Sequence, residues 1–181
     1  AGWVAKLRSV GVIMIGYTPD DYGTRPLWSL KADADKYKNW YGADGLFIDE
    51  VINVKGYESH YRDITTYAKS IGMKMTMGNP GTDVPQSFMG TLDTFSITEG
   101  SGYPPMSWLQ YCTGCTTSGW HDDYDKRNFV YVRYAVGTLD TAYVEESAKW
   151  VGLMYLTNDG GSNPWDTVPS YFDTLVATLD K

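Results

Sequence analysis

The sequence predicts an α/β protein with a parallel sheet, most simply a (β/α)8 TIM barrel of which about six of the eight strand–helix units are present. Two observations predict this fold. Short apolar runs of strand length recur along the chain, and segments of helical length separate each run from the next. The 181 residues, of which 43% are apolar, are enough for a sizeable core.

The expected elements follow one another in the order strand, then helix. Apolar runs predict strands at residues 12–17, 46–49, 73–77, 92–98, 129–136 and 153–157. The intervening segments predict helices at residues 27–40, 56–71, 85–89, 140–150 and 168–179. The segment between residues 100 and 123 is expected to be irregular.

Capping residues and an apolar stripe support individual helices. Gly72 is suited to a left-handed C-cap after the helix at residues 56–71. Asp140 or Thr141 is expected to cap the start of the helix at residues 140–150. In the helix at residues 56–71, side chains that recur every three or four positions predict a core-facing stripe, formed by Tyr57, Tyr61, Ile64 and Ala68.

Six strands are fewer than the eight that close a parallel barrel. Residues 2–11 look like the end of a helix that follows an earlier strand, so two strand–helix units are expected to precede this chain. The alternative is an open, doubly wound sheet that is complete with six strands. Because no linker or low-complexity tract interrupts the chain, residues 1–181 are expected to form one domain, incomplete on its N-terminal side.

The composition disfavours several kinds of partner. The net charge is −7, the pI is about 4.7, and no basic run occurs, so nucleic acid is not expected. The acidic surface either concentrates cations near a cleft or only maintains solubility. No apolar run is long enough to span a bilayer. The 15 tyrosines and 7 tryptophans suit the faces of sugars, but they suit a core or an interface equally well.

Two cysteines, Cys112 and Cys115, occur in the segment YCTGCTTSGW. Zinc needs about four ligands, and the spacing of the two histidines, His60 and His121, does not supply them. A redox pair usually opens a helix beside a strand, whereas Gly114 and its Thr and Ser neighbours indicate an irregular loop. We expect a disulfide that closes a short loop in an exported protein, and two free thiols are the alternative.

Acidic side chains follow two of the predicted strands. In GLFIDEV the apolar run at residues 46–48 ends in Asp49 and Glu50, and a later strand ends in Glu99 and Gly100. Adjacent carboxylates repel one another, so a chain that needed only a stable strand end would rarely place two there. Because the carboxyl ends of parallel strands lie on one face of a sheet, these residues are candidates for an acid pair that hydrolyses a sugar bond.

Each acid also has a structural interpretation. Consecutive strand residues point to opposite sides, so Asp49 and Glu50 cannot both face the barrel axis along an ideal strand. One of them can instead cap the next helix or bind a lysine. Glutamate is not a typical turn residue, so Glu50 and Glu99 are more informative than Asn79 or Asp159. Gly100, which follows Glu99, leaves room for a ligand.

Several motifs in order resemble the spherulin-4 family. The segment GYTPDDYGTRPLWSLKADADKYKNWYGADGLFIDEV contains the glycine–tyrosine strand, the YGTRP loop and the acidic doublet that are typical of that family. The motifs NPGT at residues 79–82 and NPWDTVPSYF at residues 163–172 follow. The resemblance extends from about residue 11 to the C-terminus and is weaker between residues 103 and 129.

The resemblance implies a (β/α)8 glycoside hydrolase that cuts α-1,4-linked N-acetylgalactosamine or galactosamine within exopolysaccharides. It implies Asp49 and Glu99 as the leading catalytic pair and Glu50 as a third acid, without saying which of them donates the proton. It also implies two further strands upstream, in agreement with the strand count. Side chains expected to contact the substrate are Tyr17, Tyr22, Arg25, Asn79, Tyr103, Trp108, Asp159 and Trp165.

Two of these contacts have equally good alternatives. Arg25 can bind carbonyl groups of its own loop, and Trp165 can belong to a packed loop and not to a sugar subsite.

Two other functions are also open at this point. One is a non-catalytic carbohydrate-binding or structural protein of the cell surface or extracellular space. The other is an unrelated enzyme in which Asp49, Glu50 and Glu99 bind Mg²⁺ or Ca²⁺.

The prediction from the sequence is the hydrolase, secreted or at the cell surface. Its partner is a polysaccharide of amino sugars. No metal or other cofactor is expected, and neither a GxGxxG nor a GxxxxGK nucleotide motif occurs. The distance between the two carboxyl groups would indicate whether the reaction retains or inverts the anomeric configuration.

Overall fold

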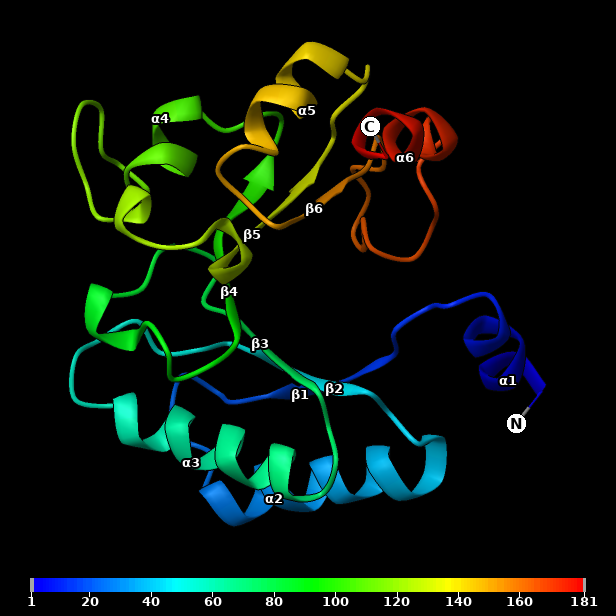
Figure 1. Cartoon of the computed structure of the whole chain (residues 1–181), viewed down its shortest axis with the longest axis vertical. Helices are drawn as coiled ribbons and strands as arrows, with labels where there is room; N and C mark the ends of the chain where they lie inside the picture. Colours follow the sequence, from blue (N-terminus) through cyan, green and yellow to red (C-terminus); the bar gives the residue numbers. More distant parts are fainter. Residues whose placement is uncertain (1, 181) are drawn as a thin grey trace. The chain divides into compact units, whose positions relative to one another are not determined.

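A computed structural model describes residues 2–180 of the chain (Figure 1). The contacts among these residues divide them into two compact units. Unit 1 consists of residues 2–80 and 84–95, and unit 2 consists of residues 81–83 and 96–180. The expectation of a single domain stays a prediction.

Unit 1 begins with a helix and continues with alternating strands and helices. Its elements are α1 (Gly2–Ser9), β1 (Ile15–Pro19), α2 (Leu27–Lys36), β2 (Gly45–Asp49), α3 (Glu58–Ser70) and β3 (Met75–Asn79). A π-helical turn at Tyr37–Tyr41 extends α2, and a 3₁₀ turn at Gln86–Phe88 precedes the next strand.

Alternation along the strands gives the sheet of unit 1 two different faces. Leu46 and Ile48 of β2 are fully buried, whereas Phe47 and Asp49 are partly exposed. Figure 1 shows α2 and α3 side by side against one face of β1–β3. The buried residues therefore pack under the helices, and Asp49 belongs to the opposite face.

Unit 2 has shorter helices and more irregular structure. Its elements are β4 (Thr94–Ser101), whose first two residues belong to unit 1, then α4 (Met106–Gln110), β5 (Phe129–Tyr134), α5 (Thr141–Ser147), β6 (Leu153–Leu156) and α6 (Phe172–Leu179). Two 3₁₀ turns, His121–Asp123 and Lys126–Asn128, connect α4 to β5. Helix α5 packs on β5 through Tyr131 and Ser147, whose hydroxyl groups are 3.0 Å apart.

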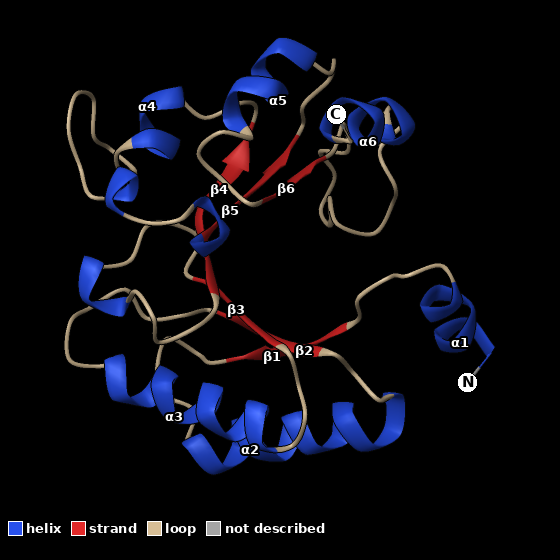
Figure 2. Ribbon diagram, in the orientation of Figure 1, coloured by secondary structure: helices blue, strands red, loops and turns tan. Residues whose placement is uncertain are grey.

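The strands follow one another in the sheet in the order of the sequence, from β1 to β6 (Figure 2). The pairs β1–β2, β2–β3, β3–β4 and β5–β6 are parallel. Sequential order is that of a (β/α) barrel, because a doubly wound sheet reverses direction at a switch point. The predicted parallel α/β fold is therefore confirmed. Separately, no helix within residues 2–180 has the length and apolar character needed to cross a membrane.

Some boundaries and one helix differ from the prediction. Within the expected helix at residues 85–89 only the 3₁₀ turn Gln86–Phe88 forms, because the backbone is already extended at Met89 (φ −58°, ψ 132°). The short helix α4 lies inside the segment that was expected to be irregular. Strand β1 starts at Ile15 and not at residue 12, since the Met14 N–H donates to the Asp44 carboxylate (3.0 Å).

Helix-capping predictions agree with the structure. Gly72 is left-handed (φ 81°) after α3, in which Tyr61, Ile64 and Ala68 are fully buried as the stripe predicted. The prediction was wrong for Tyr57, which precedes the first turn of α3 and is 37% exposed. The Asp140 carboxylate accepts a hydrogen bond from the N–H of Tyr143 (3.0 Å), so Asp140 is the N-cap of α5. The sequence therefore correctly predicted the residue at which α5 begins.

Replacing Asp140 with alanine is expected to lower the free energy of unfolding by about 1 kcal/mol, because an N–H in the first turn of α5 loses its acceptor. Asp140→Asn is the matched control, since asparagine caps helices about as well as aspartate. Urea denaturation of both variants measures the difference. Equal losses in the two variants would show that charge, and not capping, is what matters at this position.

Candidate functional site

The Asp49 carboxylate is held between two neighbouring strands. Its Oδ2 accepts a hydrogen bond from the Tyr17 hydroxyl of β1 (2.9 Å), and its Oδ1 accepts one from Nδ2 of Asn79 in β3 (2.9 Å). The register pairs Pro19 with Asp49 and Asp49 with Asn79, so three strands end at one level. Three of the predicted site residues, Tyr17, Asp49 and Asn79, are therefore in direct contact.

Tyr17 joins this acid to an aromatic surface. Its ring stacks on Phe47 with 5.9 Å between centroids and 18° between planes, and half of its surface is exposed. Burial of the hydroxyl, together with its hydrogen bond to the Asp49 carboxylate, raises the pKa of Tyr17 to about 12. The phenol therefore keeps its proton and donates to Asp49 throughout the neutral range.

Glu50 and Tyr22 both have unusual backbone conformations. Their φ angles are 55° and 52°, in the left-handed region that non-glycine residues rarely occupy. The Tyr22 N–H donates to the Glu50 carbonyl (2.8 Å), which links the loops after β1 and β2. Gly23 follows, and a Cβ there would lie 2.8 Å from the Tyr57 ring. Strained residues of this kind collect at functional sites.

Arg25 binds its own loop. Its Nη1 donates to the Pro19 carbonyl (2.5 Å) and the Thr18 hydroxyl (2.8 Å). Its Nη2 donates to the Ser29 hydroxyl (2.7 Å) and pairs with the Asp33 carboxylate (2.6 Å). These contacts favour the structural alternative, in which Arg25 fixes the loop that carries Tyr22.

A buried cluster below Asp49 was not predicted from the sequence. Asp20 is fully buried, and its carboxylate accepts from the Tyr61 hydroxyl (2.6 Å) and contacts Nε2 of His60 (2.8 Å). The Asp20 N–H donates to the Asp49 carbonyl (2.8 Å). The cluster therefore fixes the end of β2 from below. The sequence signal was weak, because Asp20 reads as an ordinary turn residue.

In unit 2, Glu99 lies near the end of β4. The Thr98 hydroxyl accepts from Nη1 of Arg133 (3.0 Å), and a Cβ on Gly100 would lie 3.1 Å from the same nitrogen. Thr98 and Gly100 thus face Arg133, and by alternation Glu99 projects to the opposite face. The room left by Gly100, which was expected to serve a ligand, is filled by the guanidinium of Arg133.

Trp165 forms an aromatic cluster with two strand residues of unit 2. Its ring lies 5.8 Å from Tyr134 of β5 and 6.0 Å from Tyr155 of β6, and 38% of its surface is exposed. Asp159 organises the connecting loop by accepting from the Gly161 N–H (3.0 Å) and the Thr167 hydroxyl (3.0 Å). These hydrogen bonds lower the pKa of Asp159. Trp165 is both packed and accessible.

Tyr103 and Trp108 are the remaining predicted contacts. The Tyr103 hydroxyl accepts from the Asp140 N–H (2.8 Å), and its ring lies 4.4 Å from that of Tyr143. The Tyr143 hydroxyl in turn donates to the Pro104 carbonyl (2.7 Å). Tyr103 therefore ties the loop after β4 to the start of α5, and Trp108 lies on α4 with its side chain partly exposed.

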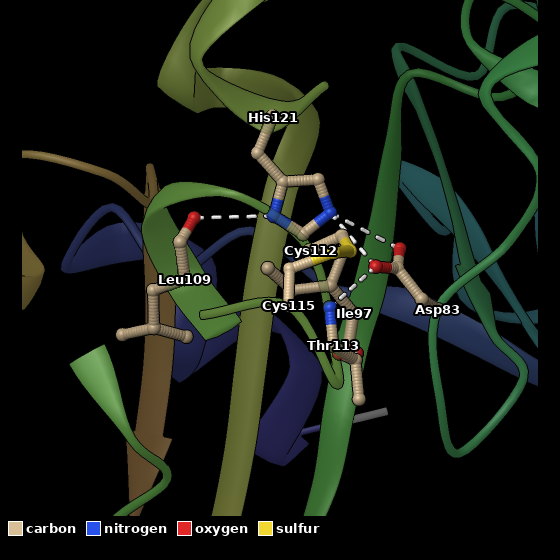
Figure 3. The surroundings of a disulfide bond; sticks show 7 residues. All are labelled: Asp83, Ile97, Leu109, Cys112, Thr113, Cys115 and His121. Carbon is tan, nitrogen blue, oxygen red and sulfur yellow. Dashed lines mark hydrogen bonds and ion pairs between the residues drawn. A yellow bond between two sulfur atoms is a disulfide. The ribbon is translucent and has the colours of Figure 1, made fainter. Parts of the chain in front are cut away.

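Cys112 and Cys115 form a disulfide that closes a short loop (Figure 3). Between them, Thr113 donates its N–H to Asp83 (2.8 Å) and its hydroxyl to the carbonyl of Ile97 (2.5 Å). Ile97 precedes Glu99 by two positions on β4. The disulfide loop is thus fastened to the strand that carries Glu99.

His121 completes the support of the disulfide loop. It is almost fully buried, with Nδ1 3.2 Å from the Leu109 carbonyl and Nε2 2.9 Å from the Asp83 carboxylate (Figure 3). Both ring nitrogens are therefore engaged, as are the sulfurs of the two cysteines. Across residues 2–180, no group of three or more His, Cys, Asp or Glu side chains is arranged to hold a metal ion.

The chain is similar in sequence to a known protein family. Residues 2–179 match the sequence model of the Spherulation-specific family 4. Spherulin-4 of Physarum polycephalum is 27% identical over 186 aligned positions, which cover 98% of this chain and 55% of that protein. The chain thus spans about half the length of this relative.

A solved structure with the same fold is the crystal structure of Aspergillus clavatus Sph3 in complex with GalNAc. The TM-score is 0.81 with 16% sequence identity, and the match covers 99% of this chain and 77% of that chain. This similarity shows a shared fold, and the predicted fold class and the predicted family resemblance are both confirmed.

The pKa of Tyr17, about 12, is expected to fall toward the ordinary value in Asp49→Asn, because the acceptor loses its charge. A folded-state pKa above the unfolded value stabilises the fold fully below about pH 10, and that contribution disappears as the pH rises through the folded pKa. NMR titration of protein labelled with ¹³Cζ-tyrosine measures the pKa of Tyr17, and the Tyr17→Phe variant identifies its signal. Tyr171, whose pKa burial also raises to about 12, is the control and should not move.

The double variant Cys112→Ser/Cys115→Ser is expected to lose about 2 kcal/mol of stability, since a closed loop of about four residues restricts the unfolded chain by that amount. The same change should speed hydrogen exchange at the Thr113 N–H, which donates to Asp83. Wild-type protein, oxidised and reduced, provides the matched comparison in urea denaturation. An unchanged unfolding midpoint in both comparisons would contradict a stabilising role for the disulfide.

Proposed function

The chain belongs to the Spherulation-specific family 4, and from this premise we propose that it is an endo-acting glycoside hydrolase. The proposed substrate is an exopolysaccharide that contains α-1,4-linked N-acetylgalactosamine or galactosamine. The observation that carries the proposal is the Asp49 carboxylate, whose two oxygens accept hydrogen bonds from the ends of two neighbouring strands. An acid fixed in this way at the carboxyl end of a parallel sheet is suited to chemistry.

Glycosidic cleavage needs two carboxyl groups in different roles. One stabilises or attacks the oxocarbenium-like centre, and the other protonates the leaving oxygen. We assign the first role to Asp49, because it cannot rotate without losing its bonds to Tyr17 and Asn79. Glu99, at the end of its own strand, is then the proton donor.

Glu50 is assigned to the substrate's acetamido group. Its left-handed backbone redirects the chain immediately after Asp49, and its side chain is partly exposed. In an α-linked N-acetylgalactosamine the acetamido group lies cis to the leaving oxygen, so its carbonyl cannot displace that oxygen from behind. Glu50 is therefore given only the role of orienting the substrate, by accepting a hydrogen bond from the acetamido N–H. The stereochemistry of the product, read by NMR of the first sugar released, distinguishes retention from inversion.

The aromatic residues support a sugar polymer as the ligand. Trp165 is exposed over 38% of its surface and rests on Tyr134 and Tyr155, so one face of a sugar ring can stack on it without rearrangement. The Sph3 structure contains GalNAc, which suggests the same class of sugar here. A disulfide persists in oxidising surroundings, in line with a protein that is secreted or displayed at the cell surface.

A carbohydrate-binding protein without catalysis is the second candidate, and the Trp165 cluster favours it as much as it favours the hydrolase. Trp165→Ala tests whether the Trp165 cluster binds the polymer, because it should weaken affinity for the polymer in either case, whereas the length of the polymer distinguishes the two candidates. A binding protein would bind the polymer and leave its length unchanged.

Glu99→Gln and Asp49→Asn are each expected to reduce cleavage of partially deacetylated poly-α-1,4-galactosamine by at least about 10²-fold, since a proton donor or a charged partner is lost. Product length by mass spectrometry measures the cleavage. Asp63→Asn, at an exposed position on α3, is the matched control and should retain full activity.

Both active-site variants should unfold at the temperature of the wild type within a few degrees, which excludes misfolding as the cause. Undiminished cleavage by Glu99→Gln would remove Glu99 from the mechanism. A wild-type protein that binds the polymer and never shortens it would replace the hydrolase by the binding protein.

A further inference from the structure

We propose that Arg133 is a positioning residue for Glu99, which it serves by binding the Thr98 side chain before that acid and the main chain beyond it. This inference rests on the proposed function for its catalytic consequence. The clamp itself is a property of β4 and β5, which lie in unit 2 apart from the first two residues of β4. Arg133 is on β5, and no feature of the family resemblance pointed to it.

Three hydrogen bonds define the clamp. Nη1 of Arg133 donates to the Thr98 hydroxyl (3.0 Å), just before Glu99. Nη2 donates to the Ser101 carbonyl (2.7 Å), and Nε donates to the Gly102 carbonyl (2.7 Å), both beyond Glu99. One rigid, planar guanidinium therefore spans residues 98–102, and its fork geometry fixes their relative positions.

The main chain beside Glu99 is adapted to this arrangement. A Cβ on Gly100 would lie 3.1 Å from Nη1 and 3.3 Å from Cζ of Arg133, so a larger residue would press on the guanidinium. The Gly102 N–H donates to the carbonyl of Tyr134 (2.9 Å), which fastens the same segment to β5 a second time. The main chain at the end of β4 therefore leaves the space that the Arg133 guanidinium occupies.

Stability alone does not explain a buried arginine in this strand. Arg133 is only 7% exposed, and its three hydrogen bonds go to one hydroxyl and two carbonyl oxygens. Burial lowers its pKa, but a guanidinium keeps its charge in proteins. A buried charge whose bonds go to neutral oxygens is expensive, and an apolar side chain would hold the strand more cheaply.

The effect on Glu99 follows from alternation. Arg133 occupies the side of β4 that Thr98 and Gly100 face, so it does not compete with substrate on the side to which Glu99 projects. It fixes the Cα of Glu99 from behind through the residues before and after it. Displacement of a catalytic group by about 1 Å can reduce the rate about 100-fold.

The test compares Arg133→Met, which keeps an unbranched stem without the guanidinium and loses all three hydrogen bonds, with Arg133→Lys and Thr98→Val. We expect kcat for polymer cleavage to fall about 100-fold in Arg133→Met with little change in KM, because positioning and not binding is lost. Arg133→Lys should recover part of kcat, and Thr98→Val should lose several-fold as one of three bonds disappears. Arg127→Gln, at an exposed arginine paired with Asp125, is the matched control with wild-type kcat.

Hydrogen exchange supplies a readout that needs no activity. The Glu99 and Gly102 amides donate to the carbonyls of Gly81 and Tyr134, and their exchange should quicken at least tenfold in Arg133→Met. The Val51 amide of unit 1, which donates to Asn79, should exchange at its wild-type rate. If Arg133→Met does not fold, Thr98→Val and Arg133→Lys carry both measurements.

Two results would overturn the proposal. One is exchange at Glu99 and Gly102 that stays at the wild-type rate in every folded variant. The other is kcat within about twofold of wild type in a variant whose exchange has quickened. A wild-type protein that cleaves no polymer would instead refute the proposed function, and the exchange rates would still decide whether Arg133 clamps the strand.

Discussion

Parallel strands in register bring their last residues to the same level, and in unit 1 that places Pro19, Asp49 and Asn79 beside one another. The two hydrogen bonds to the Asp49 carboxylate depend on this register, because Tyr17 and Asn79 reach it from the two neighbouring strands. A slip of one residue in either pair would turn the partner to the face that the helices cover. The hydrophobic residues Leu46 and Ile48, fully buried under those helices, prevent such a slip. The core of unit 1 therefore determines the geometry of its acid.

Buried polar groups lie at the carboxyl ends of the strands in both units. Asp20 with Tyr61 and His60 lies below Asp49, and Arg133 lies behind Glu99. Each of these groups is hydrogen-bonded, as the cost of burying an unpaired polar atom requires. They hold main-chain segments in place at the ends of the strands. The acids that the substrate would meet are thus supported by polar groups that it would not contact.

Strand–helix alternation and both acidic strand ends could be predicted because each depends on residues close together in the chain. The periodicity of α3 and the Asp140 cap are further examples. The prediction of a helix at residues 85–89 was wrong because so short a segment does not reveal where its backbone becomes extended, which happens at Met89. Helix α4 was missed because its five residues show no full period. Local pattern is informative only over several turns.

Supporting residues were harder to predict, because their partners are distant in sequence. Asp20 and His60 are 40 positions apart, and Thr98 and Arg133 are 35 apart. The sequence by itself determined which residues form strands and helices and where the acids fall along them, since hydrophobic period and turn chemistry act between near neighbours. Only the tertiary structure decided that His60 and Tyr61 bind Asp20 and that Gly100 makes room for Arg133, because those outcomes depend on which distant side chains the packing of strands and helices brings together.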